Sequence, residues 1–527
     1  MKRIDHRRAA AASCRLALFL LLVLGVSACG SQAPGAHSYA AKTTDPAMTD
    51  ASAVTEDLAG AADPVKADPA VRVMTDEAEQ DSAGSDPADD TGEVILGDEQ
   101  FDEYLPLLAG KRVALFSNHT GIVGDRISAP DRADAGTAPA AEHTDVAVPS
   151  SAVPSDPDIP FGTDPEGGEP VYGEHILDAL LSRGVDVTLI FCPEHGFRGT
   201  EDAGASVDDS VDERTGIPIL SLYGDSGSAA SARKNTDRFD ILVADMQDVG
   251  LRYYTYYLTL YSLMDVCSAA GREVLILDRP NPNGFYVDGP ILQEGYRSGV
   301  GRLPIPVVYG MTWGELAQMI NGEGWLSTGR DACDLTVIPC RNYTHQTLYS
   351  LIRRPSPNLK DMRAVYLYAS TCFFENTAMS VGRGTDHPFE IFGSPQLAGL
   401  AGYSFSFTPE SMPGAQDPPF RNETCYGADL RTVPIDEILE NGVDPSYLVR
   451  AYRAWQEASG KGSFWGKPDR NGIYWIDRLS GSDALRIMVE EGKTAEEIKA
   501  SWQDDIRTFR EQRKPYLLYE DNPGSYR

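Results

Sequence analysis

The chain has 527 residues, of which 78 are acidic and 46 are basic, and its formal net charge is −32. A chain this acidic lacks the basic face that phosphate backbones require, so a nucleic-acid partner is excluded. Beyond the N-terminal segments described next, roughly 430 residues remain. This exceeds what one hydrophobic core normally serves, so we expect two domains.

The N-terminus has the pattern of an export signal. Lys2, Arg3, Arg7 and Arg8 precede an apolar run, Leu16 to Val26, that is too short for a resident transmembrane helix. The run closes with Val26-Ser27-Ala28-Cys29-Gly30, which resembles a bacterial lipobox, in which Cys29 takes a lipid and becomes the mature N-terminus. We expect 1–29 to be a lipoprotein signal peptide and the exported protein to be anchored in a membrane, at the cell surface or the periplasmic face. The alternative is an ordinary signal peptide that contains a cysteine.

Two acidic segments have compositions that cannot form a core. Residues 30–92 are rich in Ala, Asp, Pro, Ser, Thr and Glu, so we expect a disordered linker there. A second such stretch, at about 129–168, interrupts compact sequence and is interpreted as a long surface insertion.

Strand and helix patterns alternate from about residue 93 to residue 300. The apolar, β-branched runs predict strands at 112–117, 185–191, 217–222, 241–245 and 274–277, with helices at 173–184 and 253–270. This alternation predicts an α/β domain with a Rossmann-like, mainly parallel sheet. No GxGxxG follows the first strand, so a dinucleotide site has little support and no cofactor is expected.

Polar residues follow each predicted strand. They are Asn118 and Thr120, Glu194 and His195, Tyr223, Asp245 and Gln247, and Asp278 and Asn281. Because parallel strands end at the same edge of a sheet, we expect these groups to converge on one rim. The alternative for each residue alone is that Asn, Asp and Thr are common in loops and helix caps.

The segment Asp245–Tyr257 combines acid, amide, guanidinium and phenol groups at the entry of a helix. Aromatic faces beside hydrogen-bonding groups suit a sugar ring. Tyr254 can equally belong to the buried stripe of that helix. We expect both, with Arg252 and Tyr253 presented at the rim.

The pattern changes after residue 300. A capping box, Thr312 to Glu315, predicts a helix at 313–321, and 335–338 predicts a strand in a smaller α+β domain at 301–527. A glycine-rich cluster, 373–390, contains Glu375 and Arg383. Glu375 can face Glu194 across a domain cleft, or Arg383 can form a structural ion pair in a glycine-rich turn. The six cysteines of the folded part show no metal-ligand spacing, and Cys333 with Cys340 is the nearest plausible disulfide.

Taken in order, these motifs resemble those of the NamZ-type exo-β-N-acetylmuramidases, a family formerly known as a domain of unknown function. The matching segments are Pro193-Glu194-His195-Gly196, Gly199, Asp202-Ala203-Gly204, Thr215-Gly216-Ile217-Pro218, Leu222-Tyr223-Gly224, Asp245 to Tyr256, Asp278-Arg279-Pro280-Asn281-Pro282, Tyr309-Gly310-Met311-Thr312 and Glu375 to Thr385. The resemblance implies a cleft between two domains and release of terminal β-linked N-acetylmuramic acid from the non-reducing end of peptidoglycan fragments. Peptidoglycan-derived muramyl saccharides are therefore the expected partners.

The resemblance and the chemistry together suggest roles. Glu194 is the candidate general acid and His195 its orienter, with Glu375, then Asp245 and Asp202, as the second catalytic group, or the substrate's own acetamido group instead. Arg252 and Arg383 are candidates for the lactyl carboxylate. The candidate substrate-binding residues are Asn118, Asp202, Gln247, Arg252, Tyr253, Tyr254, Asn281, Asn376, Arg383 and Thr385.

The chain departs from the family pattern in two places. The acidic insertion follows the loop Asn118-His119-Thr120-Gly121, where the family has a shorter connection and Gln in place of His119. The N-terminal linker lies outside the family core and resembles a tether. Two other functions stay open: a metal-dependent peptidoglycan amidase or deacetylase, and a non-catalytic lipoprotein that binds wall sugars. No HExxH or similar spacing favours the first, so no metal ligand is assigned.

Overall fold

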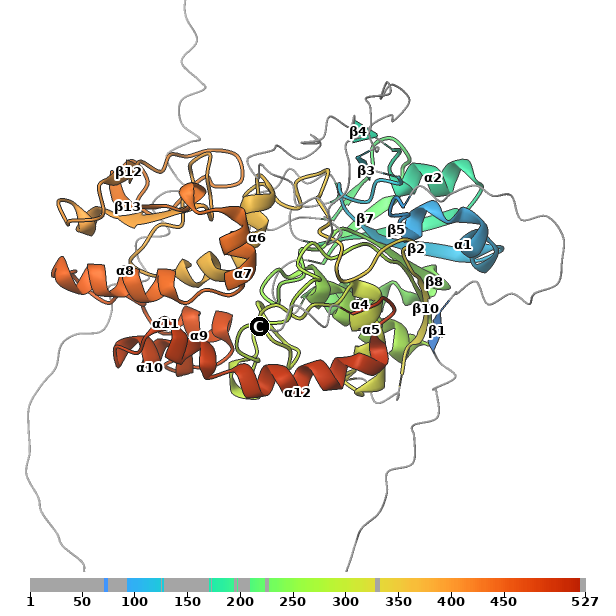
Figure 1. Cartoon of the computed structure of the whole chain (residues 1–527). Coiled ribbons are helices and arrows are strands. Elements are labelled where there is room, and N and C mark those ends of the chain that lie inside the picture. Colours follow the sequence, from blue (N-terminus) through green and yellow to red (C-terminus); the bar gives the residue numbers. More distant parts are fainter. Residues whose placement is uncertain are drawn as a thin grey trace, which may run out of the picture. The chain divides into compact units, whose positions relative to one another are not determined.

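The largest element of the fold is an eight-stranded sheet with the order β1-β10-β9-β8-β2-β5-β7-β6, seen in the computed structural model of the chain (Figure 1). Its strands are β1 (Val71–Val73), β2 (Arg112–Ser117), β5 (Asp186–Cys192), β6 (Ser210–Val211), β7 (Pro218–Ser221), β8 (Ile241–Asp245), β9 (Glu273–Leu277) and β10 (Asp334–Ile338). Neighbouring strands are parallel, except that β6 runs antiparallel to β7. The prediction of a mainly parallel sheet is confirmed.

The structure describes residues 71–73, 92–124, 126–127, 170–171, 173–193, 197, 209–222, 227–327 and 332–521. All of them belong to one compact unit, Ala67–Arg527. The predicted signal peptide at 1–29 and the acidic insertion at 129–168 lie outside the described residues.

The six main parallel strands have the order of a doubly wound fold. Taken along the chain as strands one to six, β2, β5, β7, β8, β9 and β10 are arranged 3-2-1-4-5-6 across the sheet. The order reverses between β2 and β8. Folds of this type bind ligands outside the carboxyl ends of the strands at such a reversal, which is called a switch point.

Helices cover both faces of the sheet. They are α1 (Phe101–Leu108), α2 (Ile176–Ser182), α3 (Gly227–Lys234), α4 (Tyr256–Ala270) and α5 (Trp313–Gly322). Side chains alternate along β2: Phe116 is buried in one core with apolar residues of α4 and α5, and Leu115 is buried in another with α1 and α2. The predicted helix at 253–270 begins three residues later, because Tyr253 and Tyr254 lie in the turn before it.

A separate three-stranded antiparallel sheet with the order β11-β13-β12 belongs to the C-terminal part. Its strands are β11 (Ile391–Ser394), β12 (Phe405–Phe407) and β13 (Cys425–Asp429). The helices after residue 360 are α6 (Met362–Thr371), α7 (Ile435–Asn441), α8 (Ser446–Glu457), α9 (Trp475–Ser480), α10 (Ala484–Glu490), α11 (Ala495–Ala500) and α12 (Gln503–Arg513). The expected smaller α+β part is present.

Two boundaries differ from the prediction. Strand β10 pairs in parallel with β9 along its whole length, so the predicted domain boundary at residue 300 cuts through the sheet. Strand β1 lies inside the predicted disordered linker, 30–92, and pairs with β10 at the sheet edge. Val-Arg-Val has β-branched residues on alternate positions, which suits an edge strand even within a polar segment.

The acidic insertion leaves the fold between two short paired strands. Strand β3 (Arg126–Ile127) runs antiparallel to β4 (Pro170–Val171), and these strands flank the inserted residues. The insertion therefore departs from and returns to neighbouring points of the chain.

The cysteines of the described residues are all free and buried: Cys192, Cys267, Cys333, Cys340, Cys372 and Cys425. The suggested bridge between Cys333 and Cys340 is not formed. The thiol of Cys340 instead lies 3.2 Å from the carbonyl oxygen of Asp278, at the end of β9.

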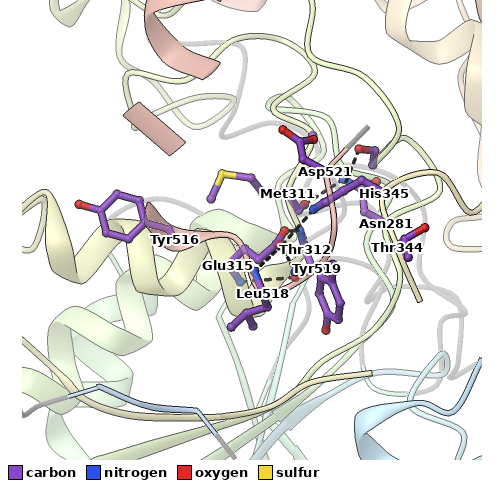
Figure 2. A network of polar contacts seen from close by, with 12 residues as sticks. Asn281, Met311, Thr312, Glu315, Thr344, His345, Tyr516, Leu518, Tyr519 and Asp521 are labelled. Atoms are coloured by element: carbon purple, nitrogen blue, oxygen red, sulfur yellow. Dashed lines mark hydrogen bonds and ion pairs between the residues drawn. The ribbon is translucent and has the colours of Figure 1, made fainter. Parts of the chain in front are cut away.

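A buried polar network attaches the C-terminal strap, residues 514–521, to the start of α5 (Figure 2). The Glu315 carboxylate accepts hydrogen bonds from the backbone of Thr312, as the predicted capping box requires, and of Leu518 in the strap. His345 Nε2 lies 3.0 Å from Glu315 Oε1, and its Nδ1 lies 3.0 Å from the Gly284 carbonyl oxygen. Both ring nitrogens face acceptors, so the protonated imidazolium is the form that can donate to both.

The His345–Glu315 pair should make stability depend on pH. Burial lowers the pKa of His345, but the Glu315 carboxylate outweighs this effect and raises it above the usual 6.5. The contribution of this pair to the free energy of unfolding is therefore fully present below pH 6.5 and is lost as the pH rises through the raised pKa of His345. At pH 6, His345→Ala should lower the free energy of unfolding by about 3–5 kcal/mol, because it leaves a buried carboxylate uncompensated.

Urea denaturation of the wild type and His345→Ala between pH 6 and pH 9 measures this effect. The difference between the two proteins should shrink with rising pH, and Glu315→Gln should remove most of the pH dependence. Parallel stability curves for the wild type and His345→Ala would contradict the assignment of a charged pair.

Candidate functional site

The loops that follow β2 and β8 are joined at the switch point. Asn118 Oδ1 accepts hydrogen bonds from the backbone N–H and the hydroxyl of Thr120, at 2.9 and 2.7 Å. The Thr120 hydroxyl oxygen in turn accepts one from the backbone N–H of Gln247, at 3.0 Å. All three residues are buried. The predicted convergence of polar strand exits is therefore present for these two loops.

Asp245 is bound in a buried ionic cluster at the same edge. Arg279 Nε lies 2.6 Å from Asp245 Oδ1, and Arg279 Nη2 lies 2.5 Å from Asp98 Oδ2. Burial lowers the pKa of Arg279, but the two carboxylates outweigh this and raise it. Both carboxylates are fully buried. Asp245, a predicted catalytic group, instead neutralises an arginine that ties three chain segments together.

Asn281, which follows β9, supports the neighbouring loops. Its Nδ2 donates to the Met311 carbonyl oxygen at 2.9 Å, and its Oδ1 accepts from the backbone of Asn283 at 2.8 Å. A Cβ atom at Gly250 would lie 2.0 Å from Asn281 Oδ1, and Gly250 also has a positive φ of 73°. Only glycine fits where these two loops meet.

The sequence predicted that Arg252 would be presented at the rim, and this prediction is wrong. Arg252 is completely buried, and its guanidinium donates to the carbonyl oxygens of Pro290, Ile305 and Leu479, each at 2.7 Å. Burial lowers its pKa to about 10. Both Nη groups are used to connect loops and the whole side chain is buried, so Arg252 has no accessible face for a substrate carboxylate.

The predicted aromatic platform is a buried junction. The Tyr253 hydroxyl donates to the Ala369 carbonyl oxygen of α6 at 2.6 Å, and the Tyr254 hydroxyl donates to that of Pro355 at 2.6 Å. The ring of Tyr368 packs edge-on against both tyrosines. These rings join the turn before α4 to the C-terminal part and do not offer a face to a sugar.

Glu375 and Arg383, predicted from the glycine-rich cluster, contact each other. Arg383 Nε lies 2.7 Å from Glu375 Oε1, and each side chain is 21% exposed. Burial lowers the pKa of Arg383, and Glu375 raises it by a larger amount. The ion-pair alternative therefore describes the contact, although both side chains reach solvent.

The remaining predicted residues of this cluster are also accessible. Asn376 is exposed, with a positive φ of 59°, and the Thr385 hydroxyl donates to the Gly382 carbonyl oxygen at 2.7 Å. Phe389 also has a positive φ, of 70°, and its ring lies beneath the Arg383 guanidinium. Bulky residues adopt this backbone region at a cost and are found there mostly at functional loops.

The candidates Glu194, His195, Asp202 and Cys29 lie outside the described residues. Strand β5 leads directly to the first two. Its last residues, Phe191 and Cys192, are fully buried, and Pro193 after them is buried as well.

Asp248, which follows β8 by three residues, is a further polar residue of this edge that was not predicted from the sequence. Its side chain is 7% exposed and has no cationic partner among the described residues. Oδ1 accepts from the backbone of Gly250 at 2.6 Å and lies 3.4 Å from the Tyr309 hydroxyl. Burial raises the pKa of Asp248 from 3.8 to about 7, and nearby donors, the Trp313 indole among them, oppose this only partly. The Asp-x-Gly spacing signals the turn, but burial is not visible in the sequence.

Among the described residues, no three His, Cys, Asp or Glu side chains are grouped as a metal site requires. Within the same ranges, no helix combines the length and the apolar character needed to span a membrane.

Comparison with known proteins identifies the family through two domain matches that meet within α6. Residues 166–363 match the N-terminal domain of the family described as exo-β-N-acetylmuramidase NamZ, and residues 366–519 match its C-terminal domain. The chain is 33% identical over 358 residues to the peptidoglycan β-N-acetylmuramidase NamZ of Bacillus subtilis (strain 168). That match spans 64% of this chain and 80% of the relative.

Two solved structures from Bacteroides fragilis NCTC 9343, both of DUF1343 family proteins, are also similar. The first is 44% identical, with a TM-score of 0.63, and the match covers 82% of this chain and all of that chain (100%). The second is 25% identical, with a TM-score of 0.57, and the match covers 81% and 99% respectively.

Arg252→Met should destabilise the protein, because the carbonyl oxygens of Pro290 and Leu479 lose their donor at a cost of about 1–3 kcal/mol each, and that of Ile305 keeps only the Leu292 N–H. Urea denaturation should show a loss of at least about 2 kcal/mol. Arg302→Met is the matched control: Arg302 is exposed and makes no ion pair with the described residues. Its free energy of unfolding should stay within about 0.5 kcal/mol of the wild type. Wild-type stability in Arg252→Met would contradict the structural role.

Asp248→Asn should become more stable relative to the wild type as the pH rises. The folded-state pKa of about 7 exceeds the ordinary 3.8, so the contribution of Asp248 is complete below pH 4 and is lost between pH 4 and pH 7. Each unit of the raised pKa corresponds to about 1.4 kcal/mol. Thermal denaturation at pH 4.5 and pH 8 measures the difference, and an equal difference at both values would show that Asp248 titrates normally.

Proposed function

Because the chain belongs to the family of NamZ exo-β-N-acetylmuramidases, we propose that it removes terminal β-linked N-acetylmuramic acid from the non-reducing end of peptidoglycan fragments. The observation that carries this proposal is the match of both family domains in order along one chain, with a relative that is a peptidoglycan β-N-acetylmuramidase. A switch point with polar loops from β2 and β8 supports it, since sheets of this order bind ligands there.

Glu194 is the proposed general acid. It follows Pro193 at the exit of the buried strand β5, which neighbours β2 at the switch point. Glycoside hydrolysis needs a proton donor for the leaving oxygen and a second group that attacks the sugar or activates water. His195 is proposed to orient Glu194.

Glu375 and Asp202 are the proposed candidates for the second group, together with the acetamido group of the substrate. Asp245 is a poor candidate because Arg279 neutralises it in a fully buried site. Glu375 keeps one oxygen outside its contact with Arg383 Nε and is partly exposed. It can therefore reach a bound sugar without breaking the ion pair.

Arg383 is the proposed ligand of the lactyl carboxylate that distinguishes N-acetylmuramic acid from N-acetylglucosamine. Among the described residues it bonds only through Nε, to Glu375. Its two Nη groups remain for a carboxylate, which a guanidinium binds through parallel hydrogen bonds. Arg252 is unsuited to this role because it is completely buried and both of its Nη groups donate to backbone carbonyl oxygens.

We further propose that the protein is exported and held at a membrane by lipid on Cys29, with the linker after it acting as a spacer. The basic start, the short apolar run and the lipobox-like Ser27-Ala28-Cys29 sequence support this location. Peptidoglycan fragments lie outside the cytoplasmic membrane, so the location agrees with the proposed substrate.

The proposal is tested by incubating purified protein with a chromogenic β-N-acetylmuramide and with the matching glucosaminide. The wild type should release the chromophore from the muramide, and a strong chelator should not prevent this. Glu194→Gln should lower kcat by at least about 100-fold, the usual scale for a lost general acid. Glu491→Gln, on an exposed helix end, is the matched control and should keep full activity. Release from neither substrate would overturn the proposed function.

A further inference from the structure

Two buried polar atoms near the end of β8 are incompletely hydrogen-bonded. The Trp313 indole acts as a donor toward the Asp248 carboxylate, but Asp248 Oδ2 and Trp313 Nε1 each lack a hydrogen bond of ordinary length and angle within the described part of the chain. The two residues are only 7% and 5% exposed. A buried donor or acceptor without a full hydrogen bond is destabilising, so such atoms are rare unless a ligand or water completes them.

Both residues line one small cavity. It lies at the carboxyl ends of β8 and β9, and its other walls include Arg279 as well as Asn281, Met311 and Thr312, which are labelled in Figure 2. The enclosed space holds about one water molecule. Strand β8 borders the switch point, so the cavity adjoins the place where this fold binds ligands.

The chemistry of the walls selects a hydroxyl group. An indole N–H only donates, and a carboxylate oxygen accepts, so one hydroxyl can satisfy both atoms at once. A carboxylate would be repelled by Asp248. The charge of Arg279 is already compensated by Asp245 and Asp98, so the cavity does not attract a second anion.

We propose that this cavity is a subsite that takes one free hydroxyl group of the terminal N-acetylmuramic acid. The hydroxyl donates to Asp248 and accepts from Trp313. This assignment rests on the proposed function. The lactyl ether and the acetamido group occupy two positions of that sugar, so the hydroxyl groups at C4 and C6 are the candidates.

The test uses the purified full chain with a chromogenic β-N-acetylmuramide and its 4-deoxy and 6-deoxy analogues. In the wild type, one deoxy analogue should lose about 10- to 100-fold in kcat/KM, because it leaves two buried groups unpaired. With Trp313→Phe, kcat/KM for the same analogue should be less than about threefold below kcat/KM for the parent substrate. The phenyl ring can keep the stack of Trp313 on Phe116, so the fold should persist, and circular dichroism checks this.

Trp502→Phe is the matched control. It also removes a buried indole N–H, one that donates to Asp288 at 2.8 Å, outside the walls of the cavity. Its discrimination between parent and deoxy substrates should equal that of the wild type.

The outcomes separate the two proposals. If the parent substrate is hydrolysed and the deoxy analogue loses the same factor in kcat/KM in the wild type and in Trp313→Phe, the subsite alone is overturned. If neither analogue loses kcat/KM in the wild type, the subsite is also overturned, because only water then fills the cavity. Failure of the wild type to hydrolyse the parent would overturn the proposed function and the subsite with it.

Discussion

The carboxyl edge of the large sheet depends on one buried arginine. Arg279 follows β9 and contacts Asp245 at the end of β8 and Asp98 before α1; the two carboxylates are fully buried and the arginine is 7% exposed. Removing the arginine would leave two carboxylates uncompensated in the interior, which costs several kcal/mol. The cluster therefore fixes the relative positions of the loops that carry Asn118, Gln247 and Asn281. It also explains why an acidic residue at a strand exit, an attractive position for a catalyst, has a structural role here.

Local patterns determined what could be predicted from the sequence. Strands β2 and β8 are short apolar runs, buried throughout in β8 and from Val113 onward in β2, so their bounds were predicted correctly, and the capping box at Thr312 fixed the start of α5. Strand β1 was missed because three residues in a polar segment carry too weak a signal, and its pairing with β10 is a contact between residues far apart in sequence.

The candidate site was harder to predict, because the role of a polar residue depends on what surrounds it. Arg252 and Tyr253 stand among sugar-binding residue types, yet their donors are used by backbone carbonyl oxygens from distant segments. Asp248 looked like an ordinary turn residue until its burial was known. Glu375 and Arg383 are eight positions apart in a glycine-rich loop, and both alternatives considered for them depended on a loop conformation that sequence does not fix.

The pairing of β3 with β4 has an evolutionary consequence. Paired strands lie about 5 Å apart, so any chain inserted between them begins and ends at almost the same point. Doubling the length of such a loop costs only about 0.6 kcal/mol of closure entropy. This position can therefore gain or lose whole segments without altering the sheet, and relatives are free to diverge there in length and composition while their fold is retained.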